Sequence, residues 1–220
     1  MGRGRPASCA LRVYARGVSL LRRAPVAVEP MIKGAGIAPF LIWFAQTRDA
    51  RELAALVAAL PPEASALFDA QDEALGVIAS AWYPAKSAHA LLDGIMAGHT
   101  EAEWREIARK GARAVVASTL RGVYRWLFET MMSPERYAKN AQKLFSRYFN
   151  TGTIQKTAPS PKHHLSVIRD WTSHHPMLCE LLIRSGEYIY PALGCSDVVL
   201  VREACVSDGG DECRFSIRWR

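Results

Sequence analysis

The sequence predicts an α+β domain in which N-terminal helices precede a C-terminal antiparallel sheet covered by one helix. Residues 49–129 are rich in Ala and Leu with apolar residues at helical spacing, which predicts most of the helical part. After Gly152 apolar and polar side chains alternate in short runs, as strands require. A helical segment at 175–194 separates these runs and supplies the covering helix.

Capping residues and prolines divide the helical part. Thr100 and Glu103 have the spacing of a capping box, and Ser133 followed by Pro134 is typical of a helix start. Pro61 and Pro62 end the first apolar-periodic run. We therefore expect helices over 50–60, 63–82, 84–98, 100–132 and 133–149, with a possible register break near Gly76 in the second.

The last two strands form a predicted hairpin. Two strands are expected within 152–172, and two more over 197–206 and 213–219. Between the latter pair, Gly209 and Gly210 supply the positive-φ positions of a tight turn. Cys213, Phe215, Ile217 and Trp219 share one face of the final strand, so that face is expected in the core.

Charge separates an extension from the domain. The chain of 220 residues carries a formal net charge of +7, but residues 1–30 hold six Arg against one Glu. We interpret 1–30 as a basic extension and 31–220 as a single α+β domain, for which no nucleic-acid partner is expected. No apolar run reaches the ~20 residues of a membrane span, so a cytoplasmic protein is predicted.

Four of the five cysteines lie within the last 42 residues. Glu203 and Cys205 fall on one face of a strand, and the hairpin brings Cys205 towards Cys213. Cys179, on the covering helix, approaches the same place. Thiolates and a carboxylate are ligands that zinc accepts. Alternatively, these cysteines are small buried residues that hold no metal.

The pattern from Cys179 to Trp219 resembles the vinyl reductase domain of aromatic-hydrocarbon sensors. That resemblance implies a zinc site: Cys179, Cys205 and Cys213 match its cysteine spacing, with 25 and then seven intervening residues. The family's Glu lies three residues before the middle Cys, where this chain has Arg202. Glu203 through a bulge, or Cys195, is then the fourth ligand, or the metal is absent.

A second resemblance covers 31–219. Segments such as "MIKGAGIAPFLIWFAQ" and "YAKNAQKLFSRYFNTG" are similar to a family of uncharacterised myxobacterial proteins, which implies no activity.

Other candidate sites are weaker. The closely spaced glycines lack the context of a phosphate loop, and turn chemistry explains the acidic residues at 208–212. The pairs His163–His164 and His174–His175 are interpreted as exposed or capping residues. A haem-based gas sensor also combines helices with a C-terminal sheet, but it needs a proximal His on a helix, and only His89 lies well inside one.

No catalytic constellation can be assigned, so an enzyme is not expected. We predict a sensory or regulatory domain that binds a small apolar molecule between helices and sheet, with a structural zinc, and acts through a protein partner or a homodimer. Aromatic residues on the helices over 100–149 would wall such a pocket. The alternative is a protein–protein interaction adaptor without a ligand pocket.

Overall fold

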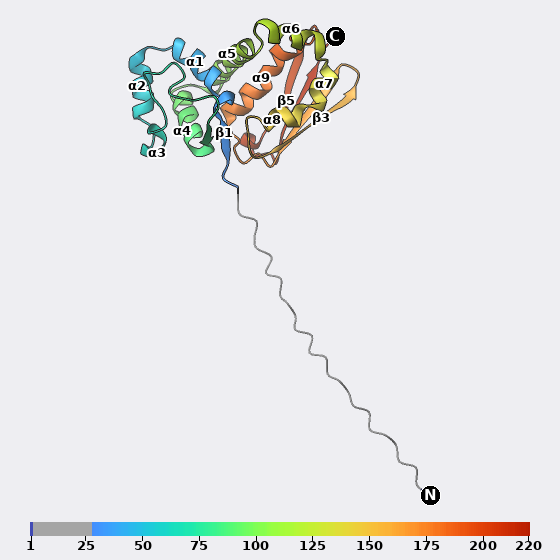
Figure 1. Ribbon diagram of the computed structural model, residues 1–220, viewed down its shortest axis with the longest axis horizontal. Helices are drawn as coiled ribbons and strands as arrows, with labels where there is room; N and C mark the ends of the chain where they lie inside the picture. The colour runs from blue at the N-terminus through green and yellow to red at the C-terminus, as the bar shows by residue number, and fades with distance from the viewer. Residues whose placement is uncertain (2–27) are drawn as a thin grey trace.

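The computed structural model describes residue 1 and residues 28–220, and it confirms the α+β class. Figure 1 shows α1 to α4 gathered on one side of the molecule and the large sheet on the other, with α9 between them. The helices are α1 (Ala38–Gln46), α2 (Ala50–Ala58), α3 (Pro62–Ser65), α4 (Ala85–Met96), α5 (Glu101–Thr119), α6 (Gly122–Met131), α7 (Pro134–Lys139), α8 (Ala141–Phe145) and α9 (Pro176–Ala192). The strands are β1 (Met31–Lys33), β2 (Trp82–Pro84), β3 (Thr153–Ser160), β4 (His163–Arg169), β5 (Val199–Ala204) and β6 (Cys213–Arg218).

The main sheet is antiparallel with strand order β3-β4-β6-β5, and α9 packs on β5 and β6. Helix α5 packs against α9, so the two long helices form a second layer over the sheet. Short strands β1 and β2 pair separately, and Ile32 bridges to Phe149 after α8. This arrangement confirms the predicted order of helices, sheet and covering helix.

Strand β6 buries the predicted face. Cys213, Phe215 and Ile217 are buried, whereas Arg214 and Arg218 are exposed. The turn before β6 uses Gly209 in the left-handed region, at φ 84°, where a residue with a Cβ would be strained. Gly209 alone supplies the positive φ that the sequence assigned to both glycines.

The predicted helix over 63–82 was wrong beyond α3. Leu75 and Gly76 both take positive φ, which no helix tolerates. The Asp72 carboxylate accepts hydrogen bonds from the backbone N–H groups of Ala74 and Gly76. Short polar side chains that capture backbone groups in this way favour turns over helices, and they outweigh the apolar spacing.

Two further helices are shorter than expected. The helix over 100–132 is divided into α5 and α6 because Leu120 and Arg121 leave helical geometry, with ψ values of 76° and 146°, and Gly122 then begins α6. The helix over 133–149 is divided at Asn140, whose side-chain amide donates to the Arg136 carbonyl. Both breaks turn the chain around the pocket described below.

The apolar run at 36–45, considered in the sequence only as a possible membrane segment, contains most of α1. Its residues Phe40, Leu41 and Phe44 are buried, and α1 packs against α5. Within the described residues, no helix is long and apolar enough to cross a membrane. Most of the predicted 1–30 extension lies outside the described residues.

Candidate functional site

The start of helix α9 positions two members of a cluster of cysteine and histidine side chains. Pro176 occupies its first turn, and the side chain of His175 caps it by accepting from the Met177 N–H. Cys179 therefore lies in the first turns of the helix, while His174 lies just outside it. Cys205 follows β5, and Cys213 begins β6.

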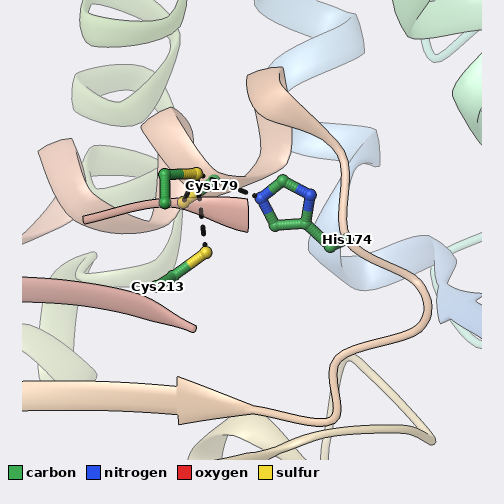
Figure 2. Close-up of side chains that lie close together, drawn as sticks. His174, Cys179 and Cys213 are labelled. Carbon is green, nitrogen blue, oxygen red and sulfur yellow. Dashed lines mark hydrogen bonds between the residues drawn. The ribbon is translucent and has the colours of Figure 1, made fainter. Parts of the chain in front are cut away.

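These four residues converge on one point. The Cys205 Sγ lies 3.6 Å from the Cys179 Sγ, 3.5 Å from the Cys213 Sγ and 3.3 Å from the His174 Nε2. All four ligand atoms lie within 4.8 Å of one another. Figure 2 shows His174, Cys179 and Cys213 pointing towards this centre from the loop before α9, from α9 and from the start of β6. The three cysteines are buried and His174 is half-buried.

Hydrogen bonding polarises the cluster. Hydrogen bonds with Cys179 and Cys213 hold the pKa of Cys205 far below its usual value, although burial opposes this. The pKa of Cys179 is raised, because it shares that hydrogen bond and is also buried. Burial acts to lower the pKa of His174, but its hydrogen bonds to Cys205 and Cys213 raise it to about 9. The hydrogen bonds of the cluster therefore favour the ionised form of Cys205 and the protonated form of His174.

The structure brings together three of the four predicted ligands. Glu203 lies at a bulge between Arg202 and Ala204, as the sequence allowed, but its side chain is exposed and does not join the cluster. Cys195 is buried elsewhere, beside the end of α9. The fourth member is His174, which sequence reasoning missed. The sequence feature that could have identified His174 is its position five residues before Cys179, just before the start of a predicted helix.

The two histidine pairs behave differently from the prediction. His175 is a capping residue, as expected, and its Nε2 contacts the Asp93 carboxylate at 3.0 Å. His174 was wrongly assigned to the surface, since it joins the cysteines. His164 is also buried, because its position on β4 faces the core, and its Nδ1 lies 2.6 Å from the Tyr190 hydroxyl.

A buried carboxylate beside the cluster ties the helices to the sheet. Glu180 is 1% exposed, and its oxygens lie 2.7 Å from the guanidinium groups of Arg105 on α5 and Arg184 on α9. Arg202 on β5 approaches the same carboxylate at 3.5 Å. One side chain thus joins three elements through charge.

A cavity of about 240 Å³ lies between the helices and the main sheet. Its walls come from α5, α6, α7, α8 and α9 and from strands β3 and β6. They include Val115, Phe128, Tyr137, Leu144, Leu182, Tyr190 and Phe215. An engineered apolar cavity of ~150 Å³ holds benzene, so this one has room for a larger apolar molecule. Among the described residues that line it, Lys156 alone carries a charge.

Comparison with known proteins places the fold. No family model and no curated protein matches this chain. A crystal structure of an Fe(II) unliganded H-NOX protein from K. algicida has a TM-score of 0.62 at 12% identity, covering 86% of this chain and 97% of that one. An H-NOX protein from S. oneidensis in the Fe(II)NO ligation state has a TM-score of 0.59 at 8% identity, covering 86% and 99%. A third structure, described as probing the function of heme distortion in the H-NOX family, has a TM-score of 0.54 at 8% identity, covering 86% and 95%.

These findings correct two predictions. The resemblance to a vinyl reductase domain was wrong, because the similar solved structures are H-NOX proteins. It rested on cysteine spacing within the last 42 residues, whereas the structural likeness covers 86% of the chain. Zinc as the cofactor was also wrong: the similar structures are described with Fe(II) and heme.

The pocket does not fit a haem. Proteins hold haem iron through His, Cys, Met or Tyr. The described lining residues include no His, Cys or Met, and His89 instead contacts the Ser173 carbonyl through its Nε2. Tyr137, Tyr148 and Tyr190 also line the pocket. The Tyr190 hydroxyl already contacts His164 and Lys156, and burial, which raises the pKa of Tyr137 to about 12 and that of Tyr190 further, disfavours a phenolate at either residue.

Size and charge lead to the same result. A cavity of about 240 Å³ exceeds the ~150 Å³ that holds a benzene ring, but haem is a macrocycle of four pyrrole rings. Lys156 would be the one described cation for two propionates. The chain therefore has the fold of H-NOX domains, built around an apolar pocket whose described lining contains no His, Cys or Met.

Proposed function

We propose that this chain is a non-enzymatic sensory domain of the cytoplasm that binds a small apolar molecule, without haem, in the cavity between α5, α9 and the sheet. The observation that carries the proposal is the cavity itself, whose walls are aliphatic and aromatic with few polar groups. Binding sites for small molecules have this character. The H-NOX-like fold supports a domain built around a central ligand. The alternative of a protein–protein interaction adaptor assumed that no ligand pocket exists, and the presence of the cavity makes it less favoured.

Helix α6 connects the pocket to the surface. Phe128 on α6 lines the cavity, while Trp126 and Met131 on the same helix are both 61% exposed. A ligand that displaces Phe128 would therefore move an exposed apolar surface. We propose that this surface contacts a protein partner or a second copy of the chain, and that ligand binding alters that contact.

The first experiment measures ligand-dependent stability. A ligand at 100 times its Kd stabilises the folded state by ~2.7 kcal/mol, which raises the Tm of a domain of this size by ~5–10 °C. We expect such a rise with naphthalene-sized hydrocarbons or alcohols. Leu182→Trp, which fills the cavity, should abolish it, and Leu127→Trp, on the exposed side of α6, should not. No rise with any member of a broad apolar panel would contradict the proposal.

A second experiment tests the absence of haem. Protein expressed with added haem precursor should purify without a Soret absorption band, because the described pocket lining contains no His, Cys or Met and the cavity is small. A stoichiometric Soret band that Leu182→Trp removes would show that the cavity opens to hold haem, and it would refute this part of the proposal.

The Cys–His cluster supports a separate proposal about its residues. We propose that Cys179, Cys205 and Cys213 bind a transition-metal ion together with His174 in place of Glu203. Three sulfurs and an imidazole within 4.8 Å of one another support this, since thiolate and imidazole are common ligands of such ions. The fold likeness gives no support for the metal's identity.

Metal content tests the assignment. Elemental analysis of protein purified without chelator should give one equivalent of metal per chain. Cys205→Ala and His174→Ala should lose it, whereas Cys195→Ala and Glu203→Gln should retain it. A metal-free parent, or a loss in Glu203→Gln equal to that in His174→Ala, would contradict the assignment.

A further inference from the structure

Lys156 enters the apolar pocket from β3. Along this strand Ile154 and Lys156 lie on the half-buried face, while Gln155 and Thr157 between and after them are exposed. The period-two alternation of a strand therefore places a lysine where an apolar residue would be expected. Among the described residues that line the cavity, it is the one charged group.

The ammonium lies among aromatic rings. Its Nζ is 4.8 Å from the ring centre of Tyr137, 5.4 Å from that of Tyr190 and 5.9 Å from that of Phe215. It donates a long hydrogen bond of 3.4 Å to the Tyr190 hydroxyl. That hydroxyl is fixed in turn by His164 Nδ1 at 2.6 Å. The ring cage and this short chain of contacts hold the amine in place.

Within the described part of the chain, no carboxylate forms an ion pair with Lys156. Aromatic faces attract a cation only weakly, and the loss of hydration of a buried cation costs more than this attraction returns. Burial accordingly lowers the pKa of Lys156 to about 7. The amine is therefore held at the pocket without the anionic partner that a buried charge normally has.

We propose that the ligand of this pocket is amphipathic, with an apolar body of about naphthalene size and a single carboxylate that pairs with the Lys156 Nζ. This inference rests on the proposed function and specifies its ligand class. The walls bury the apolar body, and the ammonium gives orientation and selects acids over neutral molecules of the same shape. Charge-assisted hydrogen bonds are the stronger ones, so one such contact can dominate selectivity.

Three probes of one shape test the ligand class: 2-naphthoate, 2-naphthalenemethanol and 2-naphthylmethylamine, titrated calorimetrically into the full chain at pH 6. At this pH the naphthoate is ionised and Lys156 is protonated. We expect the naphthoate to bind at least tenfold more tightly than the alcohol, and the amine to bind most weakly. If the alcohol binds as tightly as the naphthoate, the inference is refuted while the proposed function stands. If none of the three binds, both fail.

Variants assign the preference to the amine. Lys156→Met should bind the alcohol as the parent does and should lose the tenfold preference for the naphthoate. Lys143→Met, an exposed lysine on α8, should keep that preference. Lys156→Gln provides a second neutral variant if the methionine variant folds poorly. A preference that persists in both neutral variants would refute the inference.

A pH profile gives an independent readout. Affinity for the naphthoate should fall as the pH rises through about 7 in the parent and stay level in Lys156→Met. The neighbouring groups do not titrate there: burial lowers the pKa of His164 to about 4, and it raises that of Tyr137 to about 12 and that of Tyr190 further. Glu135 on α7 is ionised throughout, since hydrogen bonding lowers its pKa. A profile that is flat in the parent would contradict the pairing.

Discussion

Replacing Glu180 with Gln should destabilise the domain strongly. The substitution preserves the shape of the side chain but removes the charge that faces Arg105, Arg184 and Arg202. Removing one partner of a buried ion pair costs ~3–5 kcal/mol. The side chains of the three arginines are 13–29% exposed, so water solvates part of the charge that loses its carboxylate partner. We therefore expect a decrease of about 2–4 kcal/mol in the free energy of unfolding.

Thermal unfolding followed by circular dichroism, with urea titration beside it, measures this effect. At ~2–4 °C per kcal/mol, the expected decrease in Tm is about 4–16 °C. Glu187→Gln is the matched control: it lies on the same helix, shares Arg184 and also contacts Arg109, but it is 18% exposed. Partly exposed pairs contribute about 0–1 kcal/mol. If Glu180→Gln loses no more stability than Glu187→Gln, the idea that Glu180 ties the helices to the sheet is refuted.

Three further predictions concern the pocket, the packing and the extension. Burial lowers the folded-state pKa of Lys156 to about 7 from the usual 10.5. Between these two pH values the unfolded chain binds more protons than the folded chain. The free energy of unfolding should therefore rise as the pH increases from about 7 to 10.5. Urea titrations should show this rise in the parent and not in Lys156→Met; parallel curves would contradict it. Gly111→Ala should lower the free energy of unfolding by ~1–3 kcal/mol, because the added Cβ would lie 2.4 Å from the Phe40 ring. The control Lys110→Ala, on the exposed face of the same helix, should lower it by less than ~0.5 kcal/mol. Equal Tm values for the two variants would refute the close approach of Gly111 to Phe40. Deleting residues 2–27 should leave the Tm unchanged if they form an extension outside the domain, and a large decrease would show that they pack on it.

Local rules in the sequence determined much of the architecture. The Thr100–Glu103 capping box forms as predicted, with the Glu103 carboxylate accepting from the Thr100 N–H at 2.7 Å and the Thr100 hydroxyl accepting from the Glu103 N–H at 3.4 Å. Ser133 also caps its helix. The alternation of β6 placed Cys213 in the core correctly. These features depend on residues a few positions apart in the chain, so they can be predicted from short stretches of the sequence.

The tertiary structure alone decided the sites. Cys179 and Cys205 were expected to meet, but His174 joins them because a loop before α9 passes the hairpin, and a loop has no periodicity to read. Leu75 and Gly76 interrupt an apparent helix because nearby Asp side chains capture backbone N–H groups. The sequence predicts an ordinary strand lysine at Lys156; only the tertiary structure brings rings from α7, α9 and β6 around its side chain. Long-range contacts of this kind decide which side chains lose their water, and that loss gives the pocket its chemistry.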